Sequence, residues 1–140
     1  MKALSLYQPW ASLMALGHKR NETRGKDTAY RGPLAIHATL NLIIPNNQEF
    51  IKALNDLRLL DQEFPRGCIV GICRLVDVVR VDPVIRLGLY EDRMNCHEYL
   101  FGDYAIGRYV WITEDMKKVD PPIPCRGYPW FFDWEDPRGE

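Results

Sequence analysis

Residues 67–82 read GCIVGICRLVDVVRVD, and half of these positions hold Ile, Val or Leu. Such a composition favours extended structure, and the run is longer than an average strand. We therefore expect one long, bent strand or a strand pair at the centre of a sheet. Cys68 and Cys73 lie five residues apart in this run. That odd separation predicts opposite faces of a strand and no bond between the two sulfurs.

Shorter signals flank this run on both sides. Strands are predicted over residues 3–6, 34–38 and 108–113. Near the C-terminus, residues 121–124 (PPIP) predict a rigid extended connector, and residues 130–134 (WFFDW) predict an aromatic strand or a sheet edge.

Helical spacing appears in two further segments. One helix is expected from Pro9 to a stop at Gly17, and a second is expected to open at residues 45–46. Their core-facing residues are expected to be Trp10, Leu13 and Met14 in the first helix, and Phe50, Leu54 and Leu57 in the second. Residues 83–101, which include Tyr90, Met94 and Tyr99, have mixed periodicity and predict helix plus loop.

These elements predict the fold class. Strands that do not alternate regularly with helices indicate an α+β domain or a small mixed β-barrel with two to three short helices. A doubly wound nucleotide fold is disfavoured, because neither a G-x-G-x-x-G motif nor a P-loop occurs. The length of 140 residues, with 46% hydrophobic and 26% charged residues, is typical of one domain spanning residues 1–140.

Cysteine usage and the N-terminus limit the classes of protein. The apolar run over residues 1–6 is too short for a signal peptide or a membrane span, so a cytoplasmic location and no membrane partner are expected. Four scattered cysteines predict reduced thiols rather than a disulfide framework. Cys96-His97 is an adjacent pair without a second ligand pair at zinc spacing, so neither a metal nor another cofactor is predicted.

Residues 17–24 (GHKRNETR) begin a local concentration of positive charge. Residues 17–31 contain five bases and two acids, a net charge of +3, whereas the whole chain has a net charge of −1. Lys and Arg around a carboxylate suit an anionic or polar ligand. On a strand, Glu22 and Arg24 share a face and Lys19 starts on the other, so a bulge or the helix exit must redirect Lys19.

Three blocks of sequence together resemble the ASCH (activating signal cointegrator homology) domain family. The first block is residues 4–13, LSLYQPWASL, and the second is Gly17-x-Lys19-x-x-Glu22-x-Arg24 followed by residues 30–38. The third comprises residues 101–104, 107–111 and 122–127 with the closing tryptophans. The match is weaker over residues 39–100.

This resemblance implies a β-barrel similar to the pseudouridine synthase and archaeosine transglycosylase (PUA) domain, with the motif residues lining a cleft. It also implies association with RNA or, more broadly, nucleic acid. Some small bacterial members hydrolyse acylated cytidines with Lys, a Thr at the third motif position and a distal Glu, and others are ribonucleases. Here the third position is Glu22, Thr23 is adjacent, and Glu91 and Glu98 are candidate distal carboxylates.

Three functions follow as hypotheses. In a metal-independent ribonuclease, Lys19, alone or with Glu22, removes the ribose 2′-hydroxyl proton while Arg24 stabilises phosphate charge. A nearby carboxylate opposes this role, because it favours the charged ammonium. The second hypothesis is an amidohydrolase acting on an acylated cytidine nucleoside. The third is a non-catalytic reader module, in which aromatic side chains stack on bases.

The candidate residues are the same for all three hypotheses. They are Lys19, Glu22 and Arg24 for catalysis, and Tyr7, Gln8, Pro9, Trp10, Gly17, Thr23, Tyr30 and Arg31 for substrate binding. Trp111 is a further stacking candidate, although its strand position also suits the core, and His37 is expected to be a core residue.

The expected partner is RNA, another single-stranded nucleic acid or a modified nucleoside, and the oligomeric state stays open. Residues 114–140 carry seven acids and four bases, a net −3, and the sequence pI is near 6.3. This charge distribution favours a short single strand over a long duplex.

Overall fold

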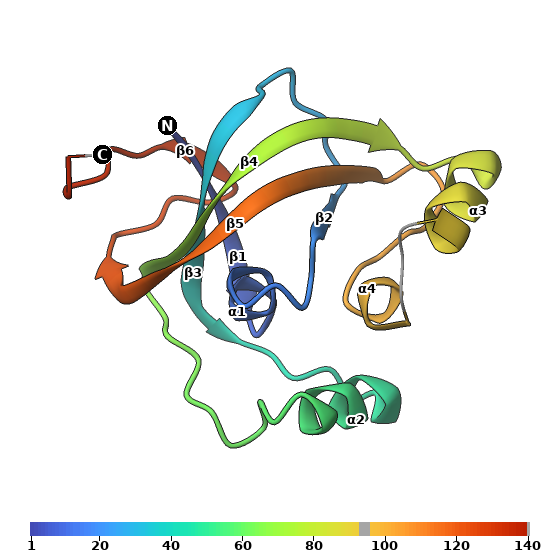
Figure 1. Ribbon diagram of the computed structural model, residues 1–140, viewed down its shortest axis with the longest axis horizontal. Helices are drawn as coiled ribbons and strands as arrows, with labels where there is room; N and C mark the ends of the chain where they lie inside the picture. Colours follow the sequence, from blue (N-terminus) through green and yellow to red (C-terminus); the bar gives the residue numbers. More distant parts are fainter. Residues whose placement is uncertain (93–95, 140) are drawn as a thin grey trace.

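A six-stranded sheet with the order β2-β5-β4-β3-β1-β6 dominates the computed structural model, which describes residues 1–92 and 96–139 (Figure 1). The strands are β1 (Lys2–Gln8), β2 (Asn21–Arg24), β3 (Gly32–Leu42), β4 (Cys68–Arg80), β5 (Tyr109–Pro124) and β6 (Phe131–Asp133). Strands β1 and β3 pair in parallel, and the other neighbouring pairs are antiparallel. The predicted strands over residues 3–6, 34–38 and 108–113 are therefore confirmed.

The long central strand is confirmed as β4, which lies between β3 and β5. Its register against β5 shifts at three places, and such bulges bend a strand. The predicted opposite faces for Cys68 and Cys73 are wrong, because both residues are buried in one apolar cluster with Val70 and Leu75. A register irregularity of β4 between Cys68 and Cys73 shifts the alternation of its two side-chain faces by one residue. Cys68, Cys73 and Cys125 are free thiols, and burial raises the pKa of Cys73 to about 12.

Helix α1 (Trp10–Ala15) lies inside the curve of the sheet and supplies its core contacts (Figure 1). Ala11, Met14 and Ala15 pack into the main buried cluster with Leu4, Leu34 and Trp111. On its other side Leu13 joins a second cluster formed by Phe50, Leu54 and Phe101. Helix α1 therefore joins two cores and fixes the start of the motif that follows it.

The other helices are α2 (Gln48–Asp56), α3 (Pro83–Asp92) and α4 (Cys96–Leu100). The described residues thus contain four short helices instead of the two or three predicted, because residues 83–101 contribute both α3 and α4. Met94 lies outside the described residues. Helix α2 starts after Asn47, whose Oδ1 accepts hydrogen bonds from the backbone N–H of Glu49 and Phe50. This cap places the start two residues later than predicted.

The C-terminal part of β5 corrects one prediction. Residues 121–124 are strand rather than connector, and Ile123 and Pro124 pair with Ile69 and Cys68. Strand β2 pairs only with the first residues of β5, so the other side of β5 is a sheet edge here, where proline need not donate a hydrogen bond. The aromatic segment forms β6, an edge strand paired with Lys2–Leu4, as predicted.

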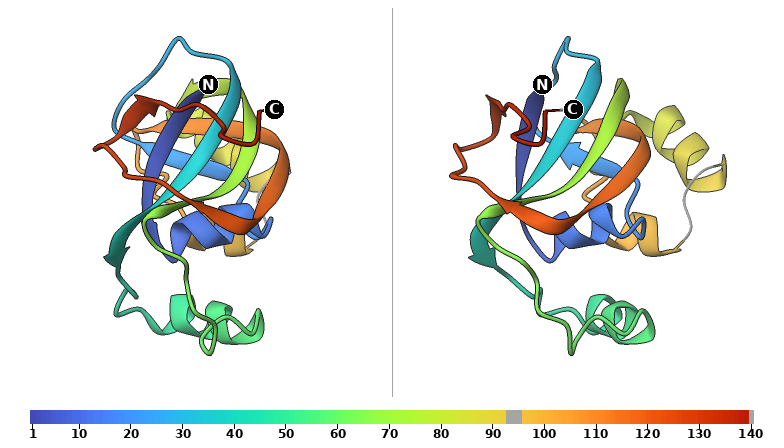
Figure 2. Two further views of the ribbon diagram at one scale, coloured as in Figure 1. Left: turned by 90° about the vertical axis from the view of Figure 1, so that its left-hand side faces the viewer. Right: turned by 60° about the vertical axis from the view of Figure 1, so that its left-hand side comes forward.

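The sheet curls strongly, and β2 and β6 are its two edges (Figure 2). No ladder between described residues joins these edges, so the fold is mixed α+β and the predicted closed barrel is not confirmed. A side chain spans the opening instead, since Arg24 of β2 donates a hydrogen bond to the Ser5 carbonyl of β1. Within the same residues, we find no helix with the length and apolar character that a membrane crossing requires.

Candidate functional site

The end of α1 sets the position of Lys19. Gly17 adopts φ +82, and the N–H groups of Gly17 and His18 donate to the carbonyls of Met14 and Leu13. These two bonds form a Schellman motif, which ends the helix and turns the chain sharply. Of the two predicted alternatives, a bulge or the helix exit, the helix exit is the one that redirects Lys19. Its side chain points inward and is 1% exposed.

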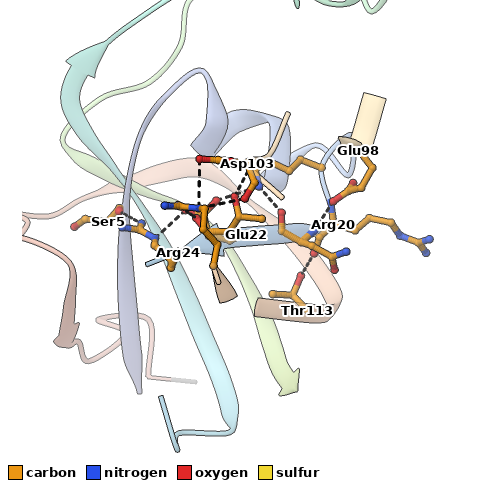
Figure 3. A network of polar contacts seen from close by, with 11 residues as sticks. Ser5, Arg20, Glu22, Arg24, Glu98, Asp103 and Thr113 are labelled. Atoms are coloured by element: carbon orange, nitrogen blue, oxygen red, sulfur yellow. Dashed lines mark hydrogen bonds and ion pairs between the residues drawn. The ribbon is translucent and has the colours of Figure 1, made fainter. Parts of the chain in front are cut away.

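The Glu22 carboxylate forms ion pairs with two cations, Lys19 and Arg24. Figure 3 shows Glu22 beside Arg24. Lys19 Nζ lies 3.0 Å from Glu22 Oε1, and Arg24 Nε lies 2.9 Å from Glu22 Oε2. Lys19 also donates to the Asn21 carbonyl, and Arg24 donates to the Ser5 carbonyl. Lys19 and Glu22 are buried and Arg24 is partly buried, so the charges of Lys19 and Glu22 depend on these partners for stabilisation.

Glu98 of α4 contacts the backbone where the chain enters β2 (Figure 3). Its carboxylate accepts hydrogen bonds from the backbone N–H of Arg20 at 2.8 Å and of Asn21 at 2.7 Å. Thr113 of β5 donates to the Arg20 carbonyl at 2.6 Å from the other side. Burial and the nearby Glu98 charge raise the pKa of Tyr104, so its hydroxyl stays neutral.

A second charged group lies at the far end of β2. Thr23 Oγ1 accepts a hydrogen bond from the backbone N–H of Asp103 at 2.9 Å. Arg108 Nη2 donates to the Thr23 carbonyl at 3.2 Å, and Arg108 Nε lies 3.5 Å from the Asp103 carboxylate. The loop before β5 is therefore fastened to the motif strand.

The three β2 residues Glu22, Thr23 and Arg24, together with Asp103 and Arg108, border a cavity of about 560 Å³, here called the motif cleft. Its lining residues are Ser5, Leu6, Tyr7, Trp10, Glu22, Thr23, Arg24, Pro45, Asn47, Phe50, Leu100, Phe101, Gly102, Asp103 and Arg108. Lys19 and Gly17 line a different cavity of about 630 Å³, together with Arg20 and Glu98. Five sequence candidates thus meet in the motif cleft, and Lys19 reaches it only through Glu22.

The model of the family described as ASCH domain matches residues 4–134. The chain belongs to the ASCH domain family. Activating signal cointegrator 1 from Homo sapiens and that from Mus musculus are each 43% identical to this ASCH domain over 81 residues. Those alignments cover 53% of this chain and 14% of each relative, so the chain matches only a small part of either protein.

Solved structures with this fold include ASCH from Zymomonas mobilis, with a TM-score of 0.51 and 19% identity over 87% of this chain and 71% of that chain. A serine-to-alanine variant of the same protein has a TM-score of 0.55 and 16% identity over 99% of this chain and 89% of that chain. At these identities the likeness concerns the fold alone.

Several sequence candidates lie outside the motif cleft of this ASCH domain. Gln8 is fully buried, donates to Ser12 Oγ and the Pro65 carbonyl, and accepts from the Ser12 N–H. Pro9 beside it is also buried. Both residues therefore fix the start of α1.

Tyr30 and Arg31 also lie elsewhere. Tyr30 packs against Phe131 and donates to the Pro33 carbonyl. Arg31 forms an ion pair with Asp77, with 3.6 Å between Arg31 Nη2 and Asp77 Oδ1. Trp111 is fully buried in the core.

The distal and metal candidates are only partly described. Glu98 contacts the motif backbone, whereas the side chains of Glu91 and Cys96 lie outside the described part of the structure. His97 stacks on Phe101 with ring centroids 5.7 Å apart. Among the described residues no group of three or more His, Cys, Asp or Glu side chains is arranged to hold a metal ion.

The sequence did not predict that the motif cleft would be lined by Asp103, Arg108, Asn47 and the aromatic side chains of Phe50 and Phe101. Asp103 and Arg108 fall within the third block of the family resemblance, and that block was the available signal. Asn47 and Phe50 come from the weakly matching middle, so no motif marked them.

Proposed function

We propose that this chain, taken as one domain over residues 1–140, binds single-stranded RNA and holds one nucleotide in the motif cleft. The observation that carries the proposal is the two-sided lining of the cleft. The aromatic part of the lining consists of Tyr7 and Trp10 together with Phe50 and Phe101, which are almost fully buried. The polar part includes Glu22 and Thr23. The volume lies within the range of small-ligand pockets.

The charges of the cleft support a base rather than a polyphosphate. Arg24 lies against Glu22, and Arg108 lies against Asp103, so the two cations of the lining are balanced by two acids. A nucleobase offers both donors and acceptors and a face for stacking, and it needs no excess of positive charge. Membership of the ASCH domain family, which is associated with RNA binding, supports the same ligand class.

The cleft also lies where the sheet is open, beside the contact from Arg24 to β1. We infer that this side-chain bridge stands in for the barrel closure that a PUA-like fold implies.

The burial of Lys19 favours binding over RNA cleavage. Its ammonium is held by Glu22 and the Asn21 carbonyl, and Lys19 lines the neighbouring cavity rather than the motif cleft. A general base must reach the proton that it removes. In this arrangement Lys19 acts on a ligand only through Glu22.

One observation favours a second candidate, the hydrolysis of an acylated cytidine. Thr23 lines the motif cleft beside Glu22. Its Oγ1 accepts a hydrogen bond from the Asp103 N–H, and this bond does not use the hydroxyl proton of Thr23. The hydroxyl of Thr23 is therefore available to a bound nucleoside.

The test measures binding of dye-labelled single-stranded RNA by fluorescence anisotropy. Tyr7→Ala should weaken binding about 5- to 150-fold, since one stacked base contributes roughly 1–3 kcal/mol. Arg108→Gln should also weaken binding. Arg31→Gln is the matched control, because its ion pair with Asp77 is similar in length (3.6 against 3.5 Å) and lies outside the cleft. Equal affinity of all four proteins would refute the site.

The same preparations distinguish the catalytic alternatives. RNA and an N-acylated cytidine are incubated with the wild type, Lys19→Ala and Thr23→Val, and the products are separated by chromatography. We expect unchanged RNA. Cleavage that disappears in Lys19→Ala would replace the reader proposal with a ribonuclease, and deacylation that disappears in Thr23→Val would establish the amidohydrolase.

A further inference from the structure

A third cavity, of about 810 Å³, adjoins the motif cleft, and Ser5, Tyr7 and Arg24 line both. We call it the aromatic groove. Its remaining lining residues are His37, Thr39, Leu40, Asn41, Gly67, Pro124, Cys125, Arg126, Gly127, Tyr128, Pro129 and Trp130. We propose that this groove binds the neighbouring nucleotide of the same RNA strand, an inference that rests on the proposed function. The ligand is then a single strand of at least two nucleotides that passes Arg24.

The groove differs from the cleft in charge. None of its lining residues is acidic, whereas Arg24 and Arg126 are both part of the lining. Lys26 adds a third cation beside Trp130. In the motif cleft each arginine is balanced by an acid. Arg24 itself is paired with Glu22, so the excess positive charge of the groove comes from Arg126 and Lys26. The phosphate that links two nucleotides therefore fits the groove side of Arg24 better than the cleft.

Cationic side chains lie over two aromatic rings of the groove. The Arg126 guanidinium lies 5.9 Å from the Tyr128 ring centroid. Arg24 and Lys26 lie 5.6 and 5.4 Å from the Trp130 ring centroid. Tyr128 is 55% exposed. An exposed ring beside phosphate-binding cations is the arrangement that stacks a base and contacts its backbone.

The backbone at Trp130 supplies an independent observation. Trp130 adopts φ +78, a left-handed conformation that is a true outlier for a bulky side chain. Its carbonyl accepts the Ser5 N–H at 3.0 Å, and its ring packs edge-on against Trp111 at 5.4 Å. Such strain persists only where the surroundings enforce it, and it concentrates at ligand sites. In this conformation the Trp130 ring lies beside Arg24 and Lys26.

The loop that carries Arg126 and Tyr128 is fastened to the sheet. Ser5 Oγ donates to the Tyr128 carbonyl at 2.9 Å, and His37 Nε2 donates to the Cys125 carbonyl at the same distance. Gly127 lies so close to His37 that an added Cβ would be 2.1 Å from the ring. The groove is thus held in one shape before the ligand arrives, which lowers the entropic cost of binding.

The four tryptophans make the two sites separately observable, because Trp10 lines the cleft and Trp130 lines the groove. The protein is titrated with a ribonucleoside monophosphate and with a trinucleotide of RNA, and the indole N–H signals are followed by two-dimensional NMR, which detects millimolar binding. We expect the mononucleotide to shift the Trp10 signal and the trinucleotide to shift both signals. Tyr128→Ala and Arg126→Gln should abolish the extra affinity of the trinucleotide, and Arg31→Gln should retain it.

The outcomes separate the two proposals. If the trinucleotide shifts Trp10 alone, or binds Tyr128→Ala as tightly as the wild type, the second subsite is overturned and the proposed function stands. If neither ligand shifts Trp10, the proposed function fails and the subsite fails with it. If the mononucleotide shifts Trp130 and not Trp10, the groove is the primary site and both assignments are overturned.

Discussion

Replacement of Glu22 by glutamine should strongly destabilise this fold. The change keeps the shape of the side chain but removes the charge that compensates Lys19 and Arg24, which lie 3.0 and 2.9 Å away. Lys19 is 1% exposed and the Glu22 side chain 12%. Removing one partner from a buried ion pair costs about 3–5 kcal/mol. Because Arg24 retains some solvent contact, we expect about 3 kcal/mol, or a fall in Tm of roughly 10 °C.

The assay is urea denaturation at neutral pH, with Asp56→Asn as the matched control. Lys52 and Asp56 form an ion pair of 2.9 Å on the exposed face of α2, so this variant makes the same chemical change without burial. We expect no measurable loss for the control. A decrease of less than about 1 kcal/mol in the free energy of unfolding of Glu22→Gln would refute the reasoning, because removing the shared anion of a buried network should cost more than that.

A double variant tests the same reasoning from the opposite direction. Lys19→Met removes the cation with little change in volume, and alone it leaves Glu22 with Arg24 only. In Lys19→Met combined with Glu22→Gln no buried ammonium is left without its anion, and only the partly exposed Arg24 has lost its partner, so the two losses should be less than additive. Strict additivity would show that the two side chains do not stabilise each other.

Two further predictions concern stability. Asn47→Ala should cost about 1 kcal/mol, because Asn47 Oδ1 caps the backbone N–H of Glu49 and Phe50, and Asn46→Ala should cost little in the same urea titration. Burial lowers the pKa of His37, so the unfolded chain binds more protons and stability should fall as pH drops below about 6.5. His37→Gln should reduce this slope without removing it, because burial and nearby His97 lower the pKa of His18 as well. An unchanged slope between about pH 7.5 and 5 would contradict the role of His37.

Local patterns were sufficient for much of the secondary structure. The run over residues 67–82 predicted β4 because branched apolar residues mark a buried strand wherever they occur. The spacing of Trp10, Leu13 and Met14 predicted α1, and Gly17 marked its end, because helix periodicity and the left-handed cap are properties of a few consecutive residues. The same logic failed for Cys68 and Cys73, since a bulge depends on the partner strand and not on the strand itself.

Only the local part of the candidate site could be predicted from the sequence. The motif was recognisable as a charged stretch after a helix, and the linear sequence was enough to require that either a bulge or the helix exit turn Lys19 toward Glu22. The burial of Lys19, the contribution of Glu98 from α4, and the pairing of Thr23 with Asp103 and Arg108 all came from the tertiary structure. These contacts join residues about 80 positions apart, and the chain between them determines their geometry only once it is folded. Sequence patterns report local periodicity, whereas a cleft forms between surfaces that only long-range packing brings together.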